Sequence, residues 1–282
     1  MKLSKIVLSI ITTVILSGCA NLAEVREFAS QSANLAAYDD LTVYFRDTYS
    51  REQPYLWGDA KDFAIQNDLK RKAAYQDLLK LNDTVVLYMQ TLGKLAGEEA
   101  TNTMMQDVDK LAISSHREFG VKDKDVEAVS NIAKIIAKWA MSAYQDDAVK
   151  AMIQESDDSL QVVLNSMNTV VRAYKGTFDN ERKYILDDFL ANQIALEEQQ
   201  ASPNQLTLAA ARRDRQQKAV QYSVIEPQYE MLQKAIASIA EGHKKLFDNI
   251  NHLDADEVKK QIDTITLQLK FINANLNALK SN

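Results

Sequence analysis

Apolar residues recur along several long segments of the chain with a spacing that alternates between four and three positions. A strict average of 3.5 keeps one narrow apolar seam facing a partner helix only if the helices wind around each other left-handedly. The pattern therefore predicts an all-α fold, an elongated antiparallel bundle of six or seven long helices with coiled-coil-like packing. The clearest seam has no exception and consists of Val258, Ile262, Ile265, Leu269, Ile272, Leu276 and Leu279.

Three further segments carry the same spacing, and one of them is interrupted by a single ionisable residue, His243. We expect His243 to be a core histidine bonded to a neighbouring carbonyl or carboxylate. The alternative is a pH-sensitive latch, because an unperturbed histidine changes charge near pH 6.5. The three seams are Ala74, Leu78, Leu81, Val85, Tyr88, Leu92 and Leu95; Ile153, Ser156, Leu160, Val163, Met167, Val170 and Tyr174; and Ile225, Tyr229, Leu232, Ile236, Ile239, His243, Leu246, Ile250 and Leu253.

Turn-forming residues place the ends of the first three helices. The first helix is expected to start close to Cys19 and to end at residues 54–58, where a proline and a glycine occur. Gly93 and Gly97 end the second helix, and a short third helix reaches about Arg117.

The second half of the chain is divided by similar features. Phe119-Gly120-Val121 turns the chain, and Asp123 or Asp125 caps a fourth helix, which has apolar residues on two sides and is expected to be the most buried. The next helix ends at Gln200, with Gly176 as a weak point. After a turn at residues 201–204, a long helix starts from a cap at Ser202 or Asn204, contains a kink at Pro227 and reaches Leu253. Asp254 and Glu257 cap the last helix.

The composition supports helices and restricts the class of partner. Hydrophobic residues make up 46% of the 282 residues, while only 7 glycines and 3 prolines occur, so a helical core is favoured. The formal charge is −6, and this acidic balance argues against nucleic acid as a partner. Cys19 is the only cysteine, which excludes a disulfide within the chain.

The first residues combine Lys2 and Lys5, an apolar run from Ile6 to Leu16, and the sequence Leu16-Ser17-Gly18-Cys19. This arrangement resembles the signal peptide of bacterial lipoproteins, in which a positive end, a short apolar segment and small residues precede a peptidase site. The resemblance implies removal of residues 1–18, a lipid attached to Cys19, and a single elongated helical-bundle domain at 19–282. The charge of that domain would be −8, because Lys2 and Lys5 are lost.

The resemblance also implies a location. In the family, aspartate directly after the lipidated cysteine favours retention in the inner membrane, whereas this chain has Ala20 and Asn21. The expected destination is the outer membrane, with the domain facing the periplasm and held by acyl chains rather than by electrostatics.

Residues with the spacing of a catalytic, cofactor or metal site are not found. No histidine follows a glutamate by three positions, as bundle metal sites require, and no phosphate loop or nucleophile elbow occurs. Two groups are candidates for partner contact. The aromatic group either closes one end of the bundle or forms an exposed hot spot, and the basic group is either a solvated face or a docking patch. The candidate residues are Tyr49, Tyr55, Trp57, Arg212, Arg213 and Arg215.

These observations favour a non-enzymatic structural or protein-interaction module, tethered to a membrane and binding an envelope protein. An inhibitor or immunity-type lipoprotein that neutralises a toxin or effector is the alternative within the same fold. A carrier of an apolar ligand is a third hypothesis and requires a cavity in the bundle. The seams also leave a homo-oligomer open, since one of them could face a second copy. The carrier's cavity would be lined by Met104, Met105, Trp139, Met141 and Met152.

Overall fold

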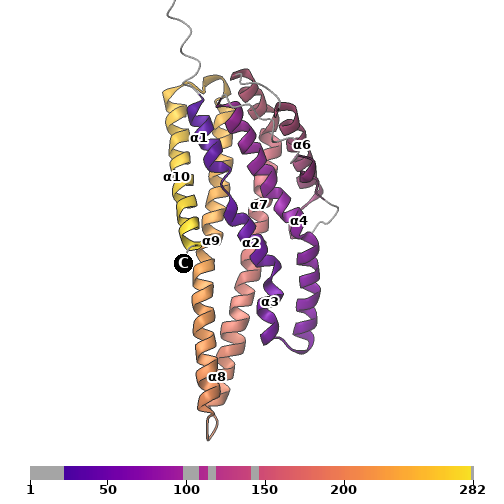
Figure 1. Ribbon diagram of the computed structural model, residues 1–282, viewed down its shortest axis with the longest axis vertical. Helices are drawn as coiled ribbons and strands as arrows, with labels where there is room; N and C mark the ends of the chain where they lie inside the picture. The colour runs from indigo at the N-terminus through magenta and orange to yellow at the C-terminus, as the bar shows by residue number, and fades with distance from the viewer. Residues whose placement is uncertain (1–21, 98–107, 114–118, 141–145, 281–282) are drawn as a thin grey trace, which may run out of the picture.

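The computed structural model describes residues 22–97, 108–113, 119–140 and 146–280, and all regular elements within these ranges are helices (Figure 1). The predicted all-α bundle is therefore confirmed. Seven of the described helices have ten or more residues: α1 (Ala23–Ser32), α2 (Ala36–Arg46), α4 (Gly58–Leu95), α6 (Asp123–Trp139), α7 (Asp146–Lys183), α9 (Gln205–Asp248) and α10 (Asp256–Lys280). The shorter elements are α3 (Thr48–Glu52), η1 (Gln53–Tyr55), η2 (Asp109–Leu111), the π-helix η3 (Tyr184–Leu190), α8 (Ala191–Glu198) and η4 (Ile250–His252).

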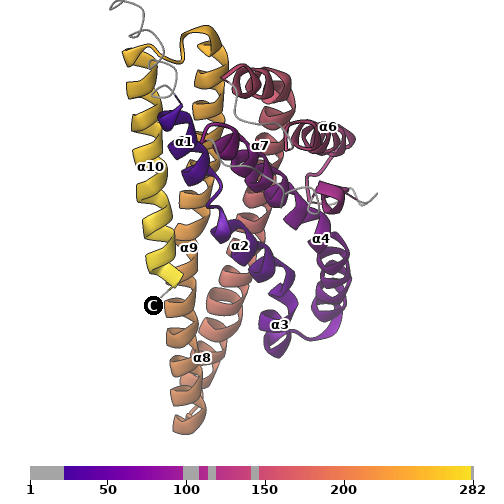
Figure 2. The ribbon, with the colours of Figure 1, turned by 45° about the horizontal axis from the view of Figure 1, so that its top comes forward.

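Helices α7 and α9 form the long antiparallel pair on which the other elements pack (Figures 1 and 2). Helix α9 has 44 residues and so is about 66 Å long at 1.5 Å per residue. Helix α10 returns along one half of α9, and α1 and α2 lie against α4. At the opposite end only η3, α8 and the start of α9 continue, as a two-helix hairpin.

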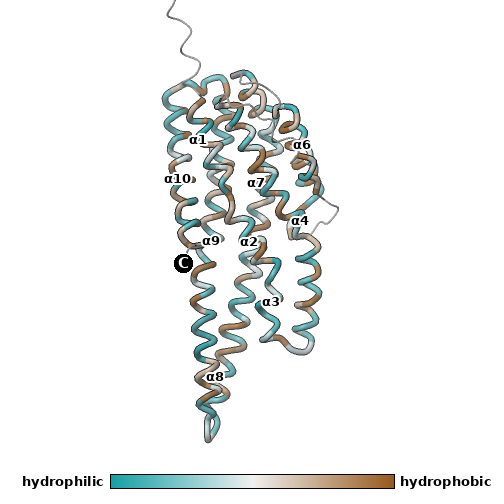
Figure 3. Tube along the Cα trace, viewed as in Figure 1, coloured by the Kyte–Doolittle hydropathy of each residue, from teal (hydrophilic) through white to brown (hydrophobic). Residues whose placement is uncertain are grey.

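Most residues of the predicted seams belong to one connected apolar core, whereas Leu279 at the end of the last seam is only partly buried. Along the helices, hydrophobic and hydrophilic residues alternate with the helical period, as Figure 3 shows, because each helix buries one face and exposes the other. Tyr88, Leu232 and Leu269, each from a different predicted seam, are completely buried. No helix within the described ranges has an apolar stretch long enough to cross a bilayer.

The first predicted helix is wrong, because three helices, α1, α2 and α3, replace it. The chain leaves helical geometry between Ser32 and Ala36, where Ser32, Ala33 and Asn34 give a polar stretch of small residues. Serine and asparagine favour local hydrogen bonds over helix continuation. The break lets each short helix bury its own apolar face, with Phe28 on α1 and Leu41 on α2.

Helix α6 differs from the prediction of a most-buried helix. It buries one face, which includes Val129, Ile132 and Ile136, while Val126 and Ile135 stay partly exposed. Two-sided burial would require neighbours on both sides, whereas its main contacts are with α7 and α4. Of the two predicted caps, Asp125 is confirmed: its carboxylate accepts a hydrogen bond from the backbone amide of Lys122, the residue before α6, at 2.7 Å.

Turn and cap predictions elsewhere have mixed outcomes. The turn at Phe119 and Gly120 is confirmed, with φ values of 56° and 98°, and Asn204 caps α9 through hydrogen bonds from the amides of residues 206 and 207. The weak point at Gly176 is wrong, because α7 continues through it. The cap at Asp254 is wrong as well, since α10 begins at Asp256. Pro227 lies inside α9, and the predicted third helix lies largely outside the described residues.

Candidate partner-binding groove

Aromatic residues from two distant parts of the chain meet where α3 ends beside the hairpin. The Phe189 ring on η3 lies 5.2 Å from that of Tyr55 and 5.3 Å from that of Trp57, between ring centroids. Such separations are typical of favourable aromatic pairs. The chain segment after η1 is thus held against the π-helix by ring contacts.

Hydrogen bonds fix Tyr55 further. Its hydroxyl donates to Asp214 Oδ2 on α9 at 2.9 Å, and its carbonyl oxygen accepts a hydrogen bond from the Tyr184 hydroxyl at 3.0 Å. Tyr55 is buried, whereas Trp57 is 65% exposed. Tyr55 is therefore held in place, and Trp57, two positions later, leaves most of its surface open to a partner.

An open groove of about 620 Å³ lies beside these aromatic residues, between η1, η3, α8 and the beginning of α9. Its walls combine apolar groups with polar ones, as binding grooves for peptides and helices do. Leu206, on one wall, is 82% exposed. The lining residues are Pro54, Tyr55, Phe189, Leu190, Gln193, Leu206, Thr207, Ala210, Ala211, Arg213, Asp214 and Gln217.

The basic candidates surround this groove but differ in their partners. Arg212 pairs with Glu198 at 2.5 Å, and Arg215 donates to the Leu186 carbonyl at 3.1 Å while lying 3.6 Å from Asp187. Arg213 lines the groove and has no ion-pair partner within the described part of the chain. Its charge is therefore available to a ligand.

The structure brings most of the predicted contact residues together. Tyr55 and Arg213 line the groove, and Trp57 packs against Phe189, which also lines it. Arg212 and Arg215 lie beside the groove in ion pairs. Tyr49 is partly buried on α3 and does not line the groove. The aromatic residues do not close the end of the bundle, because α8 and the start of α9 extend past them (Figure 1). Cys19 lies outside the described residues.

Sequence reasoning missed the π-helix that supplies Phe189 and Leu190. A π-helix bonds residue i to i+5, is rare, and is frequently located at functional sites. The stretch Tyr184–Leu190 has no composition that distinguishes it from an α-helix. Only the adjacent Asp187 and Asp188, which interrupt the apolar pattern, could have drawn attention to it.

A second polar cluster lies in the bundle core around His243. Its Nδ1 is 3.0 Å from Asp157 Oδ1, and its Nε2 is 2.7 Å from the Tyr88 hydroxyl and 3.5 Å from Ser156 Oγ. The prediction of a core histidine bonded to a carboxylate is thus confirmed. Although serine, histidine and aspartate meet here, all three are buried, so no substrate can reach them. The cluster joins α4, α7 and α9.

Burial controls the protonation of this cluster. Removal from water lowers the pKa of His243 below its ordinary value near 6.5, although the hydrogen bond with Asp157 opposes the effect. Burial alone would raise the pKa of Asp157, but the hydrogen bonds from His243 and Gln161, together with the nearby charge of Lys244, outweigh it and lower that pKa. A neutral imidazole that donates from Nδ1 to an ionised Asp157 fits both directions.

We expect the free energy of unfolding to decrease as the pH falls below about 6.5, because the unfolded chain then binds a proton that folded His243 does not. Glu52 acts in the opposite direction: burial raises its pKa to about 7, so protonation between pH 7 and 4.5 favours the folded state. Urea unfolding of wild type, His243→Gln and Glu52→Gln at pH 8, 6 and 5 separates the contributions of His243 and Glu52. His243→Gln should lose the decrease of the free energy of unfolding at acid pH, and Glu52→Gln should enlarge that decrease. The same dependence of this free energy on pH in all three proteins would refute the roles of His243 and Glu52.

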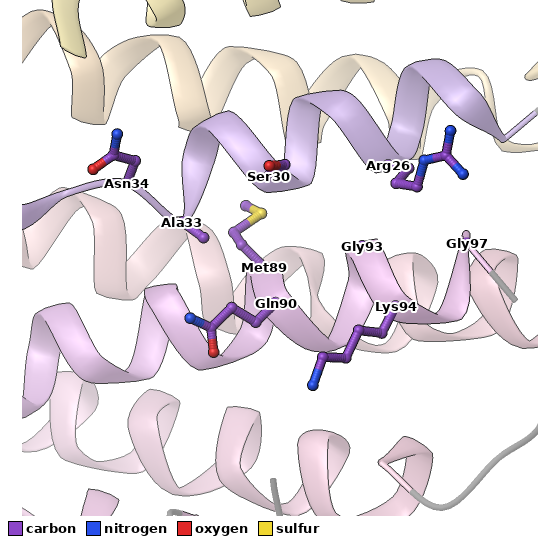
Figure 4. Close-up of a pocket in the computed structure, with 9 residues that line it drawn as sticks. All are labelled: Arg26, Ser30, Ala33, Asn34, Met89, Gln90, Gly93, Lys94 and Gly97. Carbon is purple, nitrogen blue, oxygen red and sulfur yellow. The ribbon is translucent and has the colours of Figure 1, made fainter. Parts of the chain in front are cut away.

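A second groove, of about 580 Å³, lies between α1 and α4 (Figure 4). It arises because Gly93 on α4 and Gly97, two residues after the end of α4, present no side chains to α1. Arg26 and Lys94 border it but point to opposite sides in Figure 4, so their charges do not converge on one ligand. The groove is therefore explained by the missing side chains of the two glycines, and its charges do not form a site for an ionic ligand.

No protein family, curated protein or solved structure matches this chain significantly. Within the part of the chain that the structure describes, no group of three or more histidine, cysteine, aspartate or glutamate side chains is arranged to hold a metal ion. The groove at the end of α3 is the candidate functional site because exposed apolar groups, ordered aromatic rings and Arg213 meet there.

Proposed function

We propose that the protein is a lipoprotein tethered to the outer membrane, facing the periplasm, that acts as a non-enzymatic structural or protein-interaction module. The observation that supports this most is the groove around Tyr55, Phe189 and Arg213, which lies far along the bundle from the start of α1 (Figure 1). A lipid on Cys19, three residues before Leu22, would leave the first described residue close to the bilayer, since three residues span at most about 11 Å.

The fold suits a spacer that presents a contact surface away from its anchor. Long paired helices with a continuous apolar core resist bending, so the position of the groove relative to the tether is well defined. The groove has an exposed leucine and an arginine without an ion-pair partner in the described residues, and the exposed indole of Trp57 lies beside it against Phe189. Tryptophan and arginine are the residue types most enriched at binding hot spots.

Photo-crosslinking in intact cells tests this function. A photoreactive amino acid at Gln217, which lines the groove, should give a discrete adduct, and the same group at the exposed Glu241 should not. Adding Trp57→Ala and Arg213→Glu should reduce the Gln217 adduct at least about tenfold, with an unchanged melting temperature. Equal adducts at both positions, or none at either, would count against the groove as the contact site.

The tether is tested separately by fractionation. Cys19→Ala, in a chain whose residues 1–18 are exchanged for a signal peptide that is cleaved without a lipidated cysteine, should move the chain from the outer-membrane fraction to the soluble periplasmic fraction, because acyl chains supply the binding to the bilayer. Labelling with a radioactive fatty acid should occur in the wild type and be lost in the variant. Continued outer-membrane association of an unlabelled variant would show that another contact holds the protein there.

A further inference from the structure

The end of the molecule that carries the groove is built from two helices only. We call residues 184–221 the arm: η3 and α8 on one side and the first part of α9 on the other. Elements α2, α3 and η1 run along the α7 and α9 pair as far as Tyr55, after which the chain turns away into α4 (Figures 1 and 2). The groove of the arm begins where η1 ends, on the same side of the α7 and α9 pair that α2, α3 and η1 cover.

The arm exposes large apolar side chains that a covered hairpin would bury. Leu196 on α8 is 66% exposed, and Leu206 and Val220 on α9 are 82% and 59% exposed. Helix α8 has no buried residue at all. Two helices alone bury too little apolar surface to pack well, and further helices complete such a hairpin into a bundle.

Charge is distributed unequally between the two helices of the arm. From Tyr184 to Ala211 the chain has four acidic residues and no lysine, arginine or histidine: Asp187, Asp188, Glu197 and Glu198. The next part of α9 is basic, with Arg212, Arg213, Arg215 and Lys218 around a single acidic residue, Asp214. Each arm thus places an acidic helix beside a basic helix, so two identical arms are complementary.

Ion pairs within the arm involve only some of its charged residues; of the others, Glu197 and Asp214 accept hydrogen bonds from Asn204 and Tyr55, and Lys218 lies over the Tyr55 ring. Arg212 pairs with Glu198 and Arg215 with Asp187. Arg213 and Asp188 are exposed, and neither has an ion-pair partner in the described ranges. In a two-fold symmetric interface each contact occurs twice, so Arg213 and Asp188 would give two new ion pairs between the copies.

We infer that the groove binds the arm of a second copy of this chain, forming a two-fold symmetric four-helix bundle of two arms. Each α8 packs against the partner's α9, Leu206 enters the opposite groove, and Arg213 faces the partner's Asp188. The inference rests on the proposed function, because it names the occupant of the same site. With the two-fold axis along the arms, both tethers lie on the same side, as two chains anchored in one membrane require. Confinement to a membrane would also raise their effective concentration.

Mass measurement with charge reversal tests the dimer. The purified lipidated chain in detergent should have the protein mass of a dimer, and Arg213→Glu or Asp188→Lys alone should weaken dimerisation at least about tenfold. An equimolar mixture of the two variants should recover the dimer mass, because the mixed pair restores opposite charges at both contacts. Circular dichroism melting should be the same for both variants. A monomeric wild type, or no recovery in the mixture, would overturn the inference.

Adduct masses from the photoreactive group at Gln217 distinguish this inference from the proposed function. An adduct of twice the chain mass that contains only this chain supports the second copy as occupant. A discrete adduct with another envelope protein, and none with itself, overturns the second-copy inference but supports the interaction module. A monomeric wild type with no adduct overturns both.

Discussion

Replacing Gly242 with alanine is expected to lower the free energy of unfolding by about 1–3 kcal/mol, the usual cost of overpacking a core. Gly242 lies inside α9, and a Cβ atom there would overlap Cε2 of Phe28 on α1. Because Phe28 is completely buried, its ring cannot move into solvent. The helix propensity of alanine, worth up to about 1 kcal/mol, offsets only part of this cost.

Gly176→Ala is the matched control, since Gly176 lies within α7 and has no atom within 4 Å of a Cβ position. This variant should be more stable than wild type by about 0.5–1 kcal/mol, because alanine favours helix over the unfolded chain. Urea unfolding followed by circular dichroism measures both. If Gly242→Ala were also stabilising, α1 would not pack on α9 as the structure shows.

The long helices were predictable because their pattern is local. A helix that buries one face shows this in its own apolar spacing, whatever its partner is. The partners are a different matter. Tyr88 and His243 lie on two predicted seams, and nothing in either seam indicates that they meet 2.7 Å apart. Helix pairing depends on how whole faces fit together, and spacing in one segment carries no record of it.

The candidate site was predictable by residue type and not by position. Tyr55, Trp57 and Arg213 were identifiable because tryptophan, tyrosine and arginine favour interfaces. Phe189 and Leu206 resemble ordinary apolar residues of amphipathic helices, and only the π-helix and the hairpin register place them beside Tyr55. Both features depend on tertiary packing, which local propensity does not determine.

The sequence did not indicate the ion pair between Arg51 and Glu181. Glu181 lies in the polar stretch 179–182, which resembles an ordinary solvent-exposed helix face. In the structure Glu181 is completely buried. It accepts two hydrogen bonds from Arg51, at 2.8 and 2.7 Å, and one from the Tyr222 hydroxyl at 3.1 Å. The guanidinium of Arg51 also lies 3.5 Å from the centre of the Tyr44 ring. The pair thus joins α3, α7 and α9, and α3 leads through η1 to Tyr55, which lines the groove.

Arg51→Ala is expected to destabilise the protein by about 3–5 kcal/mol, the largest effect that we predict, because it leaves the Glu181 carboxylate buried without its counter-charge. The double variant Arg51→Met with Glu181→Leu should recover most of this loss, since apolar side chains of similar size remove the uncompensated charge along with the pair. A surface pair would contribute at most about 1 kcal/mol and would weaken in high salt.

Urea unfolding of the wild type, Arg51→Ala and the double variant at 0.05 and 0.5 M NaCl distinguishes these cases. We expect the loss in Arg51→Ala to be nearly the same at both salt concentrations, because ions do not screen a buried carboxylate effectively. A loss below about 1 kcal/mol that disappears in high salt would place Glu181 in contact with water. Since α3 leads directly to Tyr55 and Trp57, Arg51→Ala should also reduce adduct formation at Gln217, whereas the double variant should retain it. That difference would show that the contact between residues 51 and 181 holds the groove in position. It would also show that an apolar contact of similar size serves as well as the charged pair.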